Sequence, residues 1–175
     1  MIHLETFGPP DYPLLISWID NAEMLMQFGG PALTFPLTPE QLKNNLSDPN
    51  RYAFKVVENS TNTTVGHGEI YSKEDGTTYL SRLLIGAENT RGKGYGTQLT
   101  HLLLAHAFDV LKQSTVFLLV FDWNKAAIHV YKKVGFTIVP GKTLLREVNG
   151  KKWTAITMSI TKEEWKRQDG VQRFE

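Results

Sequence analysis

The sequence predicts a single mixed α/β domain over residues 1–175. Three short β-branched and aromatic runs, separated by polar turns, predict an antiparallel meander. These runs are Arg51–Val57, Val65–Tyr71 and Thr78–Ile85. A glycine-rich turn then leads into an apolar-periodic helix, Thr97–Lys112, and into Val116–Phe121, an apolar run typical of a buried central strand. The chain has no internal repeat and no linker, so one domain is the simplest arrangement.

The N-terminal third predicts one strand and three short helices. Ile2–Phe7 alternates apolar and polar residues, as a half-buried strand does. The helices are expected at Asp11–Ile19, Asn21–Phe28 and Thr38–Ser47, with Asp11 and Thr38 as N-caps. This third either packs over the sheet or, through its irregular apolar stretch Ala32–Leu37, shapes an acceptor pocket.

The C-terminal third predicts a helix and a hairpin. Lys125–Lys133 is helical, and Gly135 closes it as a C′ glycine. Phe136–Val139 begins a strand. Asn149-Gly150 is the strongest hairpin signal in the chain, and it joins two further strands. These strands are Leu144–Val148 and Lys152–Ile160, and a helical turn is expected from Thr161.

Composition excludes several classes of protein. The chain has 19 Lys+Arg against 18 Asp+Glu, a balance that gives no nucleic-acid or anionic-membrane footprint. It contains no cysteine, which excludes disulfides and thiolate chemistry and fits a cytoplasmic protein. The N-terminus lacks a signal-peptide pattern, and no apolar run approaches the ~20 residues of a membrane-spanning helix.

The glycine-rich stretch Arg91–Gly96 predicts a phosphate or pyrophosphate site. Alternating glycines let several backbone N–H groups converge where a side chain would block approach. The start of the next helix adds unpaired N–H donors and the positive end of the helix dipole. The spacing matches neither the P-loop nor the dinucleotide pattern, and a plain strand-to-helix connection is the alternative interpretation.

A second motif lies at the next predicted helix, where residues 124–136 read N-x-x-A-x-x-x-Y-x-x-x-G-F. Together with R-G-K-G-Y-G after an apolar strand, it resembles the two signature motifs of the GNAT superfamily of N-acetyltransferases. W-I-D-N and F-P-L-T-P-E-Q-L further resemble the branch that includes ribosomal-protein N-terminal acetyltransferases. The resemblance implies a mostly antiparallel twisted sheet of about six to seven strands with a splayed central pair, flanked by about four helices.

The resemblance also implies where acetyl-CoA binds. In this family the cofactor lies where the strand before the glycine loop, here Leu80–Gly86, splays from the next strand, Val116–Phe121. Strand backbone groups bind the pantetheine arm, loop amides hold the pyrophosphate, and a small residue on the second helix lets the arm pass. The implied cofactor-binding residues are Leu84, Ile85, Gly86, Arg91, Gly92, Lys93, Gly94, Tyr95, Gly96, Thr97, Asn124 and Ala127.

The implied general acid is Tyr131, because the matching tyrosine of the family protonates the leaving thiolate. A phenol that is neutral at pH 7 suits this role, and a core tyrosine is the alternative interpretation. Many relatives carry a carboxylate base on the strand before the loop, but Thr78–Leu84 has none. Glu69 on the neighbouring strand, or a water ordered by Ser81, is therefore the expected base, and a solvated strand residue is the alternative for Glu69. No cluster has metal-ligand spacing, so no metal is expected.

The resemblance implies transfer of an acetyl group from acetyl-CoA to a primary amine by direct attack in a ternary complex. The acceptor is a small molecule or a protein N-terminus, and nucleic acid and membrane are not expected partners. The alternative functions are a non-catalytic acyl-CoA-binding module on the same fold and a nucleotide-binding domain. Dimers are common in this family, and the resemblance leaves the oligomeric state open.

Overall fold

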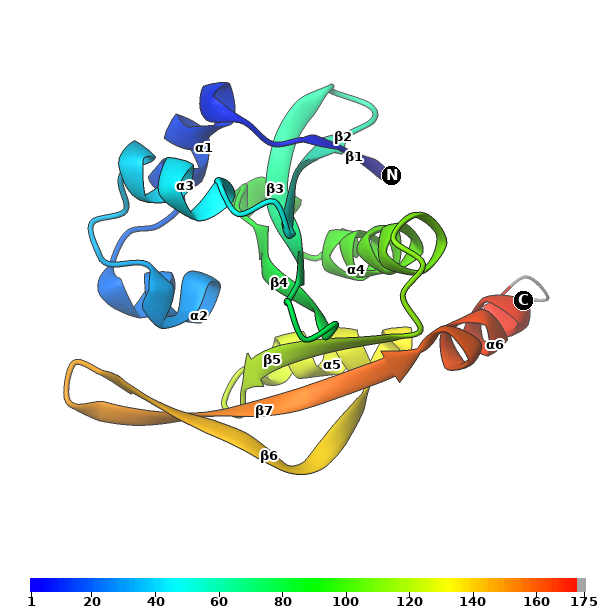
Figure 1. The fold of residues 1–175 in the computed structure, drawn as a ribbon. Coiled ribbons are helices and arrows are strands. Elements are labelled where there is room, and N and C mark those ends of the chain that lie inside the picture. The colour runs from blue at the N-terminus through cyan, green and yellow to red at the C-terminus, as the bar shows by residue number, and fades with distance from the viewer. Residues whose placement is uncertain (173–175) are drawn as a thin grey trace.

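A computed structural model describes residues 1–172 and places seven strands in one sheet (Figure 1). The order across the sheet is β1-β2-β3-β4-β5-β7-β6, and neighbours are antiparallel except β4 and β5. This confirms the predicted meander and the mostly antiparallel sheet. The strands are β1 (Ile2–Thr6), β2 (Arg51–Glu58), β3 (Thr63–Ser72), β4 (Thr78–Ile85), β5 (Thr115–Phe121), β6 (Thr137–Val148) and β7 (Lys151–Thr161).

Six α-helices flank this sheet within residues 1–172, more than the four or so implied by the resemblance. They are α1 (Tyr12–Ser17), α2 (Ala22–Gly29), α3 (Pro39–Leu46), α4 (Tyr95–Ala105), α5 (Lys125–Val134) and α6 (Lys162–Gln172). Thr38 caps α3 as predicted, because its hydroxyl accepts a hydrogen bond from the Gln41 N–H at 3.3 Å. Asp11 does not cap α1, and its carboxylate instead accepts a hydrogen bond from the Gly8 N–H at 2.9 Å.

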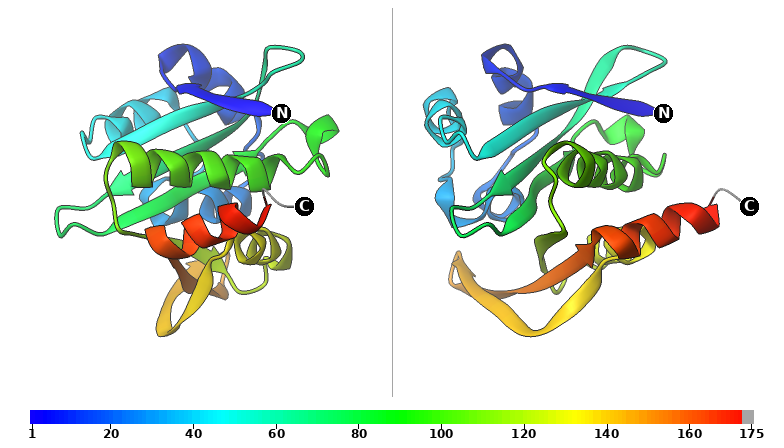
Figure 2. Two further views of the ribbon diagram at one scale, coloured as in Figure 1. Left: turned by 90° about the vertical axis from the view of Figure 1, so that its right-hand side faces the viewer. Right: turned by 45° about the vertical axis from the view of Figure 1, so that its right-hand side comes forward.

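The helices form two layers, one on each face of the sheet (Figure 2). Helices α4, α5 and α6 bury one face around Leu103, Phe108 and Met158, whereas α1–α3 bury the opposite face of β2–β4. Helix α4 lies close to β3 because β3 carries glycine there. A Cβ atom on Gly68 would meet Leu103 Cδ1 at 2.9 Å. The loop before α4 is thereby held against the sheet.

The C-terminal hairpin differs from its prediction in one respect. The two expected segments before Asn149 form one strand, β6, interrupted by a bulge where the register shifts between Ile138 and Thr143. Asn149 and Gly150 both have positive φ, +49° and +75°, as the predicted tight hairpin turn requires.

Candidate active site

The parallel strands β4 and β5 form a V-shaped notch. They pair only at Tyr79–Phe117 and Leu80–Leu118, and beyond Leu80 the two strands diverge. β5 stays paired with β7 as far as Phe121, so the backbone edge of β4 that faces β5 is left open. This confirms the predicted splayed central pair.

Of the three residues expected to contact the pantetheine arm, which lie at the end of β4 and just after it, one directs its backbone into this notch. The Gly86 N–H donates to the Val65 carbonyl at 2.9 Å, and a Cβ atom on Gly66 would lie 2.4 Å from the Leu84 carbonyl oxygen. Backbone groups of Leu84 and Gly86 therefore point toward β3. Because successive residues of a strand alternate, the N–H and C=O of Ile85 point into the notch.

The structure also gives Gly86 a packing role. A Cβ atom at Gly86 would lie 2.0 Å from Cδ2 of Trp18, whose indole covers the end of β4. The close approach of Trp18 explains why the position is glycine.

A groove of about 530 Å³ continues from the notch between the glycine loop and α5. It is lined by Ile85, Thr90, Arg91, Gly92, Gly94, Tyr95, Gly96 and Thr97, and on the α5 side by Asn124, Ala126, Ala127 and Val130. Nine of the twelve expected cofactor-binding residues line the groove. The three that do not are Leu84, Gly86 and Lys93. The structure therefore brings both sequence motifs to one surface.

The groove offers a concentration of unpaired donors. Gly94, with φ +74°, precedes α4, and the first hydrogen bond of the helix runs from the Gln98 N–H to the Gly94 carbonyl. The N–H groups of residues 95–97 thus have no partner inside the helix. Among the described residues, the exposed guanidinium of Arg91 makes no ion pair. These groups together suit a doubly charged phosphate ester.

Two loop side chains turn away from the groove. Lys93 Nζ lies 3.2 Å from Glu58 Oε1, and the Tyr95 hydroxyl donates a hydrogen bond to the same oxygen. The Lys93 side chain therefore does not line the groove, and Tyr95 contributes its backbone while its ring is buried. Sequence reasoning did not single out Glu58. The available signal was a charged residue at the end of the apolar run V-V-E.

Two of the three expected residues of this segment, Asn124 and Ala127, lie at the N-terminal end of α5. The Asn124 side chain accepts a hydrogen bond from the Ala127 N–H at 3.2 Å and so caps the helix. Tyr131 lies one turn beyond Ala127 and is half-buried, with its ring 6.0 Å from that of Phe136. Burial raises the pKa of Tyr131 to about 12, so the phenol is protonated and a donor at neutral pH. No hydrogen bond from this hydroxyl to another described residue is present.

The geometry argues against Glu69 as the base. Its carboxylate is 1% exposed and lies 2.7 Å from Arg51 Nη1, 2.9 Å from His67 Nε2 and 3.3 Å from Arg82 Nη1. Burial would raise the pKa of Glu69, but the His67 hydrogen bond and the nearby charges of Arg82, His67 and Arg51 together lower it to about 2. A carboxylate held so acidic is a poor proton acceptor at neutral pH.

The other expected participant, Ser81, lies opposite Glu69 in the β3–β4 register. Its hydroxyl is 3.5 Å from Arg51 Nη1, a long contact that leaves the hydroxyl available to water. Next to it, Arg82 has φ +54° at a bulge in β4, and its guanidinium donates to Asn45 Oδ1 at 2.7 Å. Arg82 thereby ties α3 to the sheet, and no sequence signal distinguished it.

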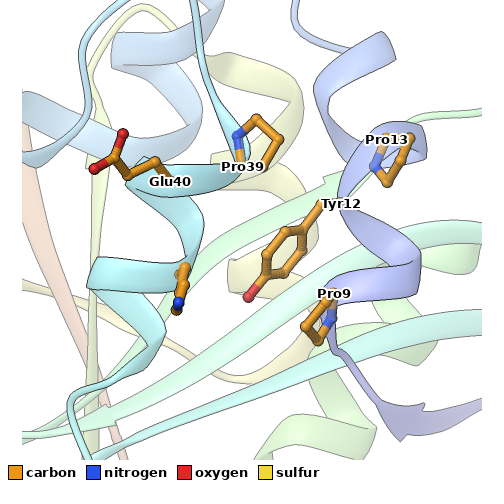
Figure 3. A pocket seen from close by; sticks show the side chains of 6 residues that line it. Pro9, Tyr12, Pro13, Pro39 and Glu40 are labelled. Atoms are coloured by element: carbon orange, nitrogen blue, oxygen red, sulfur yellow. The ribbon is translucent and has the colours of Figure 1, made fainter.

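A second hollow, of about 610 Å³, lies between α1 and α3 (Figure 3). Pro9, Tyr12, Pro13, Pro39, Glu40 and Lys43 line it, and it shares no residue with the groove. Glu40 and Lys43 are its only charged residues, so this hollow presents no constellation for acyl transfer.

Residues 1–172 contain no helix long and apolar enough to cross a membrane. Within the same range, no three His, Asp or Glu side chains gather as a metal site would require.

Comparisons with known proteins agree with this geometry. Residues 2–137 match the sequence model described as an acetyltransferase (GNAT) domain. Spermidine N(1)-acetyltransferase from Escherichia coli is 39% identical over 72 residues, which are 40% of this chain and 38% of that protein. The chain therefore matches well under half the length of this curated relative.

Solved structures show the likeness over nearly the whole chain. Spermidine N-acetyltransferase from Vibrio cholerae, in complex with CoA and spermine, has a TM-score of 0.77 at 21% identity, covering 94% of this chain and 97% of that one. An aminoglycoside acetyltransferase in complex with coenzyme A has a TM-score of 0.75 at 19% identity, covering 95% and 98%. At these identities the likeness establishes the fold.

Proposed function

The chain belongs to the GNAT family of acetyltransferases, and on that premise we propose that it transfers the acetyl group of acetyl-CoA to a primary amine of a small molecule. The observation that carries this proposal is the continuity of the β4–β5 notch with the groove of the glycine loop. A long, thin ligand with an anionic end and a reactive end fits such a path. The relatives named for spermidine and aminoglycosides support a small amine as acceptor.

In this proposal the groove binds the pyrophosphate of acetyl-CoA, and acetyl transfer takes place in the notch. The N–H groups of residues 95–97 and the Arg91 guanidinium hold the pyrophosphate, and Asn124 and Ala127 form the opposite wall. The backbone of Ile85 hydrogen bonds to the pantetheine arm in the manner of an added strand. The thioester then lies in the open part of the notch, near the start of α5.

Transfer is a direct attack of the neutral amine on the thioester carbonyl. The chain has no cysteine to carry the acetyl group. As the carbon–sulfur bond breaks, we assign Tyr131 the protonation of the departing thiolate, since its phenol is protonated and has no competing partner among the described residues. The attacking nitrogen loses its proton to water, because Glu69 is engaged by Arg51, Arg82 and His67, and a proton from water then restores the Tyr131 phenol.

The test is an acetyl-CoA-consumption screen over a panel of polyamines, aminoglycosides, amino acids and peptides with free N-termini. Release of free CoA with at least one small amine supports the proposal. Turnover restricted to the peptides would replace the small-molecule acceptor with a protein N-terminus.

Glu69 is paired with Arg51, Arg82 and His67 and so is a poor base, which favours one second candidate. This candidate is a non-catalytic acyl-CoA-binding module on the same fold. Titration calorimetry separates the two when combined with the screen. A module would bind acetyl-CoA and release no CoA with any amine. Binding of NAD or ATP in preference to CoA would contradict both functions.

A further inference from the structure

Two of the three side chains that alternate with the loop glycines, those of Lys93 and Tyr95, meet one carboxylate outside the groove. Lys93 Nζ is 3.2 Å from Glu58 Oε1, and the Tyr95 hydroxyl donates to that oxygen as well. The Thr61 hydroxyl donates to the other oxygen, Oε2, at 2.6 Å. Glu58 is only 6% exposed, so this carboxylate is surrounded by donors from the loop and from the β2–β3 turn.

The backbone of Glu58 is firmly placed. It is the last residue of β2 and pairs with Ile2 of β1 on one side and with Thr63 of β3 on the other. Its side chain shares a face with Val56, a fully buried residue of the core beneath α4. The carboxylate is therefore a fixed point at the edge of that core.

The loop is shaped to reach this point without closing the groove. Gly92 and Gly94 adopt φ values of +81° and +74°, which side-chain-bearing residues rarely adopt. These turns send Lys93 and Tyr95 toward Glu58, while Gly92, Gly94 and Gly96 line the groove. The hydrogen bonds from Thr61, Tyr95 and Lys93 lower the pKa of Glu58 to about 2, so it is an anion at every pH near neutrality.

We propose that Glu58 is a positioning residue for coenzyme A, which holds the loop in the shape that receives the pyrophosphate. The inference rests on the proposed function, because it assumes that the groove binds the cofactor. It also assigns Lys93 to Glu58 and leaves Arg91 as the one loop side chain that neutralises the pyrophosphate. A loop released from Glu58 must be reordered by the ligand, and binding weakens accordingly.

The test compares Glu58→Gln with the wild-type protein in the complete chain. Calorimetry should show coenzyme A binding about tenfold weaker, because the amide keeps its shape but loses charge-assisted hydrogen bonds. The KM for acetyl-CoA should rise by a similar factor while kcat at saturation changes less than about twofold. S-acetylpantetheine, which lacks the pyrophosphate, should react equally well with both proteins.

Two further variants make the test specific. Tyr95→Phe keeps the buried ring and removes only the hydroxyl, so it should reproduce the same split between KM and kcat if Glu58→Gln fails to fold. Glu147→Gln changes an exposed carboxylate on β6 and should leave all three readouts at wild-type values.

The outcomes are distinguishable. Unchanged coenzyme A binding in Glu58→Gln and Tyr95→Phe would overturn this inference and leave the proposed function intact. An equal loss with S-acetylpantetheine would also overturn it, since the effect would then not pass through the pyrophosphate. A wild-type protein that binds no coenzyme A would overturn the proposed function and this inference with it.

Discussion

The carboxylate of Glu69 and the guanidinium of Arg51 meet at 2.7 Å beneath α3, with the Glu69 side chain removed from solvent. Arg82 approaches the same carboxylate at 3.3 Å and extends to Asn45. One anion therefore serves two cations from neighbouring strands. A buried group in this position holds the structure together, and its removal leaves charges without partners.

Glu69→Gln should lower the free energy of unfolding by about 3–5 kcal/mol, the usual cost of breaking a buried ion pair from one side. Urea denaturation measures this loss. The matched control is Glu5→Gln, which alters an exposed carboxylate paired with Lys55 and should lower the free energy of unfolding far less. A Glu69→Gln protein of normal stability with greatly reduced kcat would restore Glu69 as a catalytic base.

The lowered pKa of Glu69 predicts that the free energy of unfolding falls in acid. On folding, the pKa of Glu69 falls from 4.5 to about 2, so its contribution is complete above the unfolded value and disappears as the pH falls toward 2. Urea denaturation from pH 6 to pH 2 should show a decline below pH 4.5 that is smaller in Glu69→Gln. Parallel curves for the two proteins would contradict this assignment.

Tyr131→Phe should lower kcat by about tenfold or more and leave the KM for acetyl-CoA nearly unchanged, because only protonation of the leaving thiolate is lost. Steady-state kinetics with the best acceptor from the screen measures both constants. Tyr52→Phe, which alters an exposed tyrosine on β2, is the control. A normal kcat in Tyr131→Phe across the pH range would remove Tyr131 from the mechanism.

The dependence of kcat/KM on pH should follow the deprotonation of the acceptor amine. With no protein base, log kcat/KM rises by about one per pH unit until the amine pKa, near 10 for an alkylamine. The pKa of Tyr131, raised to about 12, keeps the general acid protonated, so no falling limb is expected below about pH 11. For two acceptors with different amine pKa values, the plots of log kcat/KM against pH should level off at different pH values. A plateau that begins near neutrality with both acceptors would indicate a protein base.

Gly86→Ala should destabilise the protein by about 1–3 kcal/mol, the range for overpacking, because the new methyl group would overlap the indole of Trp18. Gly8→Ala is the matched control, since its Cβ would find the nearest atom at an ordinary 3.8 Å. Thermal or urea unfolding measures both. Adding Trp18→Ala to Gly86→Ala should cost less than the sum of the two single changes, and strict additivity would show that the two residues do not meet.

Much of the fold was predictable because its signals are local. The alternation of β2–β4, the glycine loop before α4 and the Asn149-Gly150 hairpin are each set by residues close together in the chain. The long β6 was predicted as two strands, because Pro140-Gly141 is a breaker in isolation. In the sheet these residues form a bulge, since β7 pairs with β6 on both sides of it.

The architecture and the two motifs that line the groove were predictable from local signals, because hydrophobic period, caps and turn residues act over a few neighbours. Contacts between distant parts of the chain were needed to show that Lys93 pairs with Glu58 and that Glu69 pairs with Arg51 and Arg82. They also showed that the backbone of Ile85, and not that of Leu84, faces the notch. These relationships depend on strand register and on a bulge at Arg82. A shift of one residue in register reverses the direction of every side chain in a strand, and the pairing that sets register comes from distant parts of the chain.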